Sequence, residues 1–179
     1  ASIIDGCRLS GARVEVYPHN DLDYLERALG QADGYPKRLI VSDALFSMDG
    51  DIADVVRLAD LARRQSAMLM LDEAHSLGLY GAEGRGVCAA QSADEDVHIL
   101  VGTLSKALGS HGGFVAGSSN LITYLRNRAR SYIFSTAAPA ANATVALANL
   151  NRLQREPHRR LHLHRLAEKL RQGLIEQQW

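Results

Sequence analysis

An apolar run over residues 67–71 ends in two carboxylates and a histidine, the first cluster in this sequence that could do chemistry. Open α/β sheets bind their ligands beyond the carboxyl ends of the strands. If residues 67–71 form such a strand, Asp72 and His75 are predicted to lie where a ligand would bind. An acidic helix cap that serves solvation only is the alternative, and this stretch alone does not decide between the two.

A single lysine among small and hydroxylated residues forms the second cluster. Lys106 follows the apolar run 97–101, and Thr103 and Ser105 lie just before it. A partly desolvated lysine loses basicity and becomes a competent amine nucleophile, while the two hydroxyls and nearby backbone amides can hold a phosphate. Most lysines simply face solvent. The functional interpretation therefore depends on both clusters being present in one chain.

A sheet is needed to bring the two clusters together. Short apolar runs alternate with amphipathic segments, which predicts an α/β fold, a three-layer sandwich with a mostly parallel sheet. Strands are expected over residues 14–17, 38–42, 67–71, 97–101, 113–116 and 132–134. Helices are expected over 22–29 after a cap at Asn20 or Asp21, over 52–61 after Asp51, and from Pro139 almost to the end, with a break at Pro157.

The composition limits the classes of partner. Twenty basic and 20 acidic residues give a formal net charge of zero, so neither nucleic acid nor an anionic membrane is expected to bind. No apolar run has the length needed to span a bilayer, and the chain does not open on a basic segment followed by an apolar one. Cys7 and Cys88 are too few and too far apart for a disulfide framework. We expect a cytoplasmic protein with a local ligand site.

Four further motifs accompany the two clusters. The six together are Pro18-His19-Asn20-Asp21, Phe46-Ser47-Met48-Asp49-Gly50-Asp51, Asp72-Glu73-Ala74-His75, Gly84-Arg85-Gly86, Gly102-Thr103-Leu104-Ser105-Lys106-Ala107-Leu108-Gly109 and Phe134-Ser135-Thr136. This set resembles the α-oxoamine synthases, fold-type I pyridoxal-phosphate (PLP) enzymes, over essentially all 179 residues. Members of that family are acyltransferases that condense an amino acid with an acyl thioester and release carbon dioxide.

The resemblance implies catalytic roles for three side chains. Lys106 would carry PLP as a Schiff base and then act as the base that removes the α-proton. Asp72 would pair with the pyridine nitrogen and keep it protonated, so that the ring accepts electrons. His75 would contact the phenolic oxygen of the ring.

The resemblance also implies four further cofactor contacts. Ser47 would lie beside the phenolic oxygen or the nearby ring atoms. Thr103 would hold the cofactor phosphate, with the Ser105 hydroxyl beside it. Thr136 would reach the phosphate of the neighbouring subunit, and this role requires a homodimer.

The chain is expected to be truncated at both ends, because it opens without Met and stops at Trp179 directly after a strongly helical stretch. Residues 1–155 would form part of the PLP-binding large domain, and residues 156–179 a helix leading toward a C-terminal small domain. The family's ring-stacking histidine, its glycine-rich phosphate segment and its carboxylate-binding arginine would lie outside this piece. The piece alone is therefore expected to bind PLP poorly and to turn over little.

The branch of the family is the next question. The motifs are closest to the 8-amino-7-oxononanoate synthases of biotin biosynthesis, which use L-alanine and a pimeloyl thioester. Asp43 stands where a glutamate is common, and Ser76 and Ser105 are also similar to serine palmitoyltransferases and to synthases associated with polyketide assembly. The acyl chain, and its carriage on coenzyme A or on a carrier protein, stay open.

Two functions of a different class compete with this interpretation. Asp72-Glu73-Ala74-His75 also matches the Walker B box of a DEAH-type ATPase, but no Gly-x-x-x-x-Gly-Lys-Ser/Thr loop precedes it. An inactive paralogue of the same fold is the other option, since fold does not fix function. Retention of both Asp72 and Lys106 argues against it.

No metal site is expected. His158 and His162 share a helix face without a further ligand, and the calcium-like start at Asp49 and Asp51 lacks the closing glutamate, so a turn and a helix cap are expected there. Glycines 81, 84 and 86 do not match the dinucleotide fingerprint and indicate a flexible loop near the cofactor.

Overall fold

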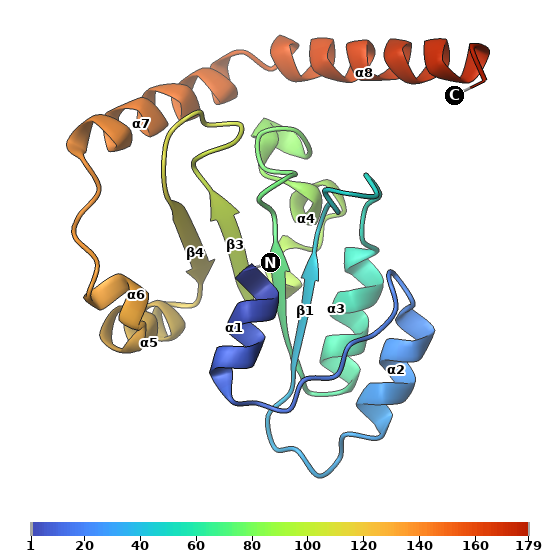
Figure 1. Ribbon diagram of the computed structural model, residues 1–179, viewed down its shortest axis with the longest axis vertical. Coiled ribbons are helices and arrows are strands. Elements are labelled where there is room, and N and C mark those ends of the chain that lie inside the picture. Colours follow the sequence, from blue (N-terminus) through green and yellow to red (C-terminus); the bar gives the residue numbers. More distant parts are fainter. Residues whose placement is uncertain (1, 179) are drawn as a thin grey trace.

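The computed structural model describes residues 2–178 and contains an open four-stranded sheet (Figure 1). The strands, in the spatial order β1-β2-β3-β4, are β1 (Leu39–Asp43), β2 (Met68–Asp72), β3 (Ile99–Thr103) and β4 (Gly113–Gly117). The first three are parallel, and β4 pairs antiparallel with β3. The expected α/β class with a mostly parallel sheet is therefore confirmed.

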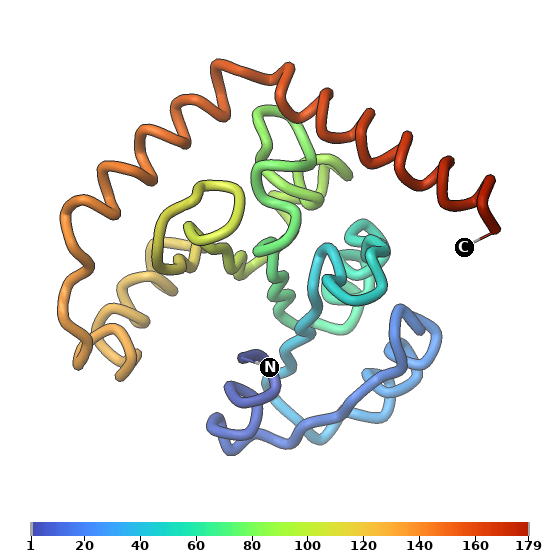
Figure 2. The backbone as a smooth tube through the Cα atoms, turned by 45° about the horizontal axis from the view of Figure 1, so that its top comes forward, coloured from blue at the N-terminus to red at the C-terminus, as the bar shows by residue number. Residues whose placement is uncertain are grey.

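Helices precede, connect and follow the strands. They are α1 (Ser2–Ser10), α2 (Leu22–Gly30), α3 (Val55–Arg64), α4 (Val87–Ala90), α5 (Ser119–Arg128), α6 (Arg130–Ile133), α7 (Ala140–Arg155) and α8 (His158–Glu176), with short 3₁₀ helices η1 (Ala82–Gly84) and η2 (Asp94–Asp96). Figure 2 shows α7 and α8 as one long arc along the side of the molecule. None of the helices within residues 2–178 has both the length and the apolar character needed to cross a membrane.

The core lies between the sheet and helices α2 and α3. Leu25 of α2 and Leu58 of α3 are buried together with Leu69 and Leu71 of β2. Burial of a leucine side chain contributes about 1.5–3 kcal/mol, so this layer fixes the position of the central strands. By contrast, neither α1 nor α8 buries a described residue.

The structure contains four of the six predicted strands, and these four pair with one another in the sheet. Those expected at 38–42, 67–71 and 113–116 are present within a residue, and the strand expected at 97–101 begins two residues later. Residues 14–17 are irregular and residues 132–134 lie in and just after α6, so both of these predictions were wrong. Short apolar runs carry no information about a pairing partner, and this is why they mislead.

The helix caps can be compared in the same way. The Asp21 side chain accepts a hydrogen bond from the Tyr24 amide at 2.8 Å and caps α2, as expected. The cap of α3 is Asp54, which accepts from the Arg57 amide at 3.0 Å, and Asp51 lies outside the helix. The break at Pro157 separates α7 from α8 as expected. Ala1 and Trp179, on which the expectation of cut ends rests, lie outside the described residues.

Candidate active site at the carboxyl edge of the sheet

The carboxyl ends of the three parallel strands bring polar groups together. Asp43 at the end of β1 is paired in register with Asp72 at the end of β2, and Asp72 is paired in turn with Val101 of β3. Thr103 ends β3 two residues further on. One oxygen of Asp72, Oδ1, accepts the Ala74 amide at 2.8 Å. Within the described part of the chain, Oδ2 of Asp72 has no partner and is free to accept from a ligand.

The electrostatics of Asp43 connect the two clusters. Burial raises the pKa of the Asp43 carboxyl above its ordinary value, and the negative charge of Asp72 raises it further. The positive charges of His75 and Lys106 act in the opposite direction on the same pKa. Asp72 ends β2, His75 lies in the turn that follows it, and Lys106 lies in the turn that follows the neighbouring parallel strand β3. The three residues therefore follow adjacent strands at the same edge of the sheet.

The segment that carries Lys106 connects β3 to β4. Thr103 Oγ1 lies 2.7 Å from Ser105 Oγ, accepts the Ser105 amide at 3.1 Å and donates to the Gly112 carbonyl at 3.1 Å. The two hydroxyls are therefore held side by side at the start of the turn. Lys106 itself is exposed, and so the partial desolvation expected from the sequence is not provided by residues 2–178, because none of their elements covers the outer side of this turn.

Glu73 is a structural carboxylate whose role the sequence analysis missed. It is 0% exposed and accepts hydrogen bonds from the amides of Val87 at 2.9 Å and Cys88 at 2.7 Å, and from the Ser76 hydroxyl. Burial, with Glu73 beside it, raises the pKa of the Cys88 thiol and keeps it protonated. Glu73 thus ties the turn that carries His75 to the start of α4.

The glycine-containing turn after His75 is closely packed. A Cβ added to Gly78 would lie 2.5 Å from Ala107 Cβ and 2.9 Å from Leu153 Cδ1, so this glycine allows the turn to touch both the lysine segment and α7. Gly84 is buried; its amide donates to the Gly81 carbonyl at 3.1 Å, and its carbonyl accepts the Gly78 amide at 2.7 Å. These contacts leave the backbone little room at Gly78 and Gly84.

Ser47 and Thr136 are less closely tied to the other candidates. Ser47 is exposed in the turn after β1, closed by the Gly50 amide donating to the Phe46 carbonyl at 2.8 Å. Its turn follows a strand and leaves the sheet at the same edge as Asp72. Thr136 is exposed in the extended segment between α6 and α7. The structure does not bring Thr136 into contact with the groups at the strand ends.

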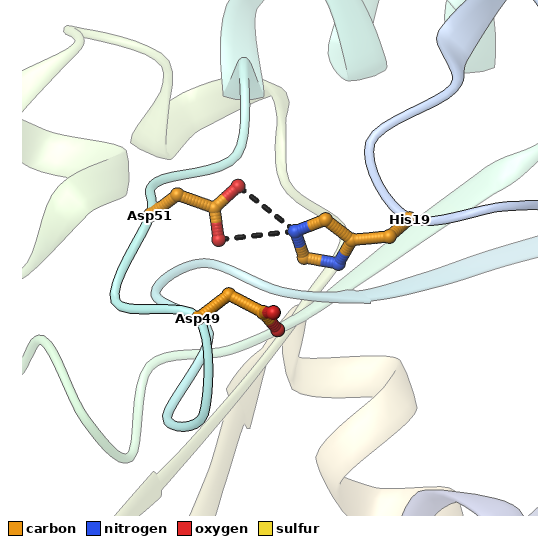
Figure 3. Close-up of side chains that lie close together, drawn as sticks. All are labelled: His19, Asp49 and Asp51. Atoms are coloured by element: carbon orange, nitrogen blue, oxygen red, sulfur yellow. Dashed lines mark hydrogen bonds and ion pairs between the residues drawn. The ribbon is translucent and has the colours of Figure 1, made fainter.

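A histidine and two carboxylates gather beside this edge (Figure 3). His19 Nε2 lies 2.9 Å and 3.1 Å from the two oxygens of Asp51, and Asn20 Nδ2 donates to the same carboxylate at 2.6 Å. His19 also packs edge-on against Phe46, with ring centroids 4.4 Å apart. Asp51 therefore joins the segment before α2 to the turn before α3, and the helix-cap role expected for it is wrong.

The histidines near the C-terminus also have a structural role. His164 Nε2 lies 2.8 Å from the Leu79 carbonyl oxygen, and its ring packs against Tyr80 with centroids 5.3 Å apart. His158 and His162 are exposed on α8. One histidine of the helix thus contacts the turn after β2, and this contact was not predicted from the sequence.

The family of the chain follows from comparison with known proteins. A family model described as aminotransferase class I and II matches residues 1–179, and the chain belongs to this family. The mostly parallel sheet and the motif resemblance both agree with membership of this family.

Two curated relatives are named 8-amino-7-oxononanoate synthase. The protein from Marinobacter nauticus is 47% identical over 174 residues, covering 97% of this chain and 44% of the relative. The protein from Chromohalobacter salexigens is 50% identical over 165 residues, covering 92% of this chain and 42% of the relative. The chain spans less than half the length of these relatives.

A solved structure agrees closely with the fold. It is described as a serine palmitoyltransferase from S. paucimobilis with a bound PLP–myriocin aldimine, and it superposes with a TM-score of 0.94 at 34% sequence identity. The match covers 98% of this chain and 46% of that chain. The expected membership of the α-oxoamine synthase group is confirmed.

Proposed function

We propose that the protein containing this chain is a PLP-dependent acyltransferase of the 8-amino-7-oxononanoate synthase type. It condenses an amino acid, L-alanine, with an acyl thioester on coenzyme A or a carrier protein and releases carbon dioxide. The observation that carries the proposal is that Asp72, His75 and Lys106 follow adjacent parallel strands at the carboxyl edge of the sheet, in a chain 47–50% identical to enzymes of that name.

The residues present fit the cofactor. Asp72 keeps Oδ2 available for a protonated ring nitrogen, while its Oδ1 is fixed by the Ala74 amide at 2.8 Å. The paired hydroxyls of Thr103 and Ser105 offer donors for a phosphate beside the lysine. The amine of Lys106 is exposed and free to react with an aldehyde. When bound, PLP supplies a ring that accepts the electrons left on the amino acid after its α-proton is removed.

The side chains of this chain then have distinct tasks. Lys106 would hold the cofactor covalently through Nζ, and its amine, once released, would take the α-proton of the amino acid. Asp72 would accept an ionic hydrogen bond and keep a proton on the ring nitrogen. His75 and Ser47 would contact the phenolic oxygen side of the ring and orient it.

The wider assembly is part of the same proposal. Residues 1–155 belong to the PLP-binding large domain, and residues 156–179 lead to the small domain. Thr136, which is exposed in the segment between α6 and α7, would reach the cofactor phosphate of a second subunit in a cytoplasmic homodimer. An exposed hydroxyl on an extended segment is suited to that role, because it needs no local partner.

The test uses the protein expressed from its complete reading frame. Borohydride treatment after addition of PLP is expected to fix the cofactor covalently on Lys106, located by peptide mass spectrometry. Lys106→Ala is expected to abolish this adduct and to lower carbon dioxide release from alanine and pimeloyl thioester by at least about 100-fold, because a positioned base contributes that much or more.

The matched controls are Lys37→Ala and Lys169→Ala, which change the other two lysines of this sequence, both exposed. Both should keep the adduct and the turnover. Absence of an adduct in the folded wild-type protein would refute the proposal. Faster turnover with serine and palmitoyl thioester would instead favour a serine palmitoyltransferase activity, which the solved neighbour's name makes the second candidate.

A further inference from the structure

Asn149 of α7 contacts the turn that carries Lys106. Its Nδ2 donates to the Leu108 carbonyl oxygen at 2.9 Å, although the two residues are 41 positions apart in the sequence. The Leu108 side chain is only 4% exposed, so the hydrogen bond holds a part of the turn that is already anchored in the protein. Figure 1 shows the β3–β4 connection reaching α7.

A second hydrogen bond joins the same two elements. Ser110 Oγ donates to the Asn142 carbonyl at 2.6 Å, and Asn142, like Asn149, belongs to α7. Between the two tethers, the Gly109 amide donates to the Lys106 carbonyl at 2.9 Å and closes the turn. The backbone of Lys106 is therefore linked through Gly109 to a segment that α7 holds on both sides.

The residue after the lysine is also confined. Ala107 Cβ lies against Gly78, and the same glycine abuts Leu153 of α7. Gly78 belongs to the turn that Glu73 ties to α4. Movement of the lysine turn away from α7 would thus have to break the Asn149 and Ser110 hydrogen bonds and open this contact.

We propose that Asn149 is a positioning residue for Lys106. This inference rests on the proposed function, since it concerns the direction in which the lysine amine is presented to the cofactor aldehyde. Asn149 touches neither the amine nor, by this assignment, the cofactor, and it acts through the Leu108 carbonyl. Without its N–H donor the turn is held from one side only, and the amine spends less time in a reactive orientation.

The experiment compares Asn149→Ala and Asn149→Asp with Asn151→Ala and Asn151→Asp in the complete protein. Asn151 is exposed on the same helix, so the paired variants make the same change in helix propensity and charge. Asp keeps the shape of Asn but cannot donate. Two quantities are measured: the rate at which PLP becomes trappable by borohydride on Lys106, and the pH midpoint of the visible cofactor band.

Both Asn149 variants are expected to slow adduct formation by at least about fivefold, the effect of one lost hydrogen bond, and to move the band midpoint. The Asn151 variants should stay within about twofold of wild type. Equal behaviour of the two pairs would overturn the inference. So would a lower melting temperature of the Asn149 variants without PLP, combined with an unchanged rate and midpoint, because that pattern indicates a role in stability only. A wild-type protein with no Lys106 adduct would refute the proposed function itself.

Discussion

Asp43 and Asp72 end neighbouring strands in the same register, and this pairing gives the site its character at the scale of single residues. Two carboxylates at one sheet edge repel each other, and Asp43 responds with a raised pKa caused first by burial and then by Asp72. His75 and Lys106 oppose the shift with positive charge. Asp72 differs from Asp43 in that its Oδ1 also accepts a backbone amide, that of Ala74, at 2.8 Å.

Asp43→Asn is expected to stabilise the cofactor-free protein at neutral pH. The pKa of Asp43 is higher in the folded chain than its ordinary value of 3.8, so its carboxylate costs no stability below that value and costs progressively more as the pH rises through the folded pKa. The gain in melting temperature should therefore be absent at low pH and present at neutral pH. Asp96→Asn, a change at an exposed carboxylate, is the control. A gain that does not vary with pH would contradict this assignment.

For single residues, the sequence shows which side chains could react, but it does not show which of them lie close together in the fold. The positions of Asp72, His75 and Lys106 just beyond the strands could be predicted, because each follows an apolar run that becomes a strand. The coupling of Asp43 to Asp72 requires the register of β1 on β2, which no local pattern encodes. Two carboxylates at the ends of consecutive predicted strands were the available signal. The burial of Glu73 had a signal as well, since it directly follows an apolar strand and precedes a serine three residues on.

The turn between β2 and α4 is the element that joins the two halves of the site. Glu73 holds its two ends together through Ser76, Val87 and Cys88. A buried carboxylate is stable only when donors surround it, and the three donors here are all uncharged. Gly86 makes this geometry possible, because a Cβ at that position would lie 2.5–2.8 Å from the atoms of the Glu73 carboxyl group.

Gly86→Ala is expected to destabilise the protein by about 1–3 kcal/mol, from the overlap with Glu73 and from its φ of +106°. Gly173→Ala makes the same chemical change in α8, where nothing lies within 4 Å of the added carbon. That variant should be neutral or stabilise by up to about 1 kcal/mol through helix propensity. Urea unfolding of the complete protein measures both. Equal effects of the two changes would show that the turn tolerates a side chain.

Among the elements, helices could be predicted from the sequence where the apolar pattern was long or where a proline marked a boundary. The apolar stripe of α3 and the proline between α7 and α8 define these helices well. The close packing of the turn at residues 81–86 could not be derived, because Gly84 lies against Leu153, far away in the chain. The tether from Asn149 to Leu108 was missed for the same reason.

The whole molecule has one well-covered face and a long exposed arm. Helices α2 and α3 bury the sheet on one side, whereas α8 extends the arc of Figure 2 without burying a residue. Leu166, Leu170 and Leu174 are spaced by four residues and form an exposed apolar stripe on α8. Contiguous apolar surface of this kind promotes association in water.

A chain of residues 1–179 produced alone is expected to self-associate at micromolar concentration through this stripe. Leu170→Gln, at a position that is 64% exposed, should shift the sedimentation coefficient toward that of the monomer. Leu9→Gln changes an 87% exposed leucine on α1 outside the stripe and should have little effect. A wild-type chain that sediments as a monomer at every concentration would contradict the expectation.

The antiparallel pairing of β4 with β3 sets an order of assembly. These strands are joined by residues 104–112 alone, whereas β1 and β2 are separated by α3 and its connections. Pairing across a short separation has the smaller entropy of loop closure and forms first. During synthesis the strands that flank Lys106 can therefore pair once residue 117 has emerged, while Asn149 is still to be made. The turn that carries Lys106 is thus flanked by paired strands early, and it is attached to α7 late.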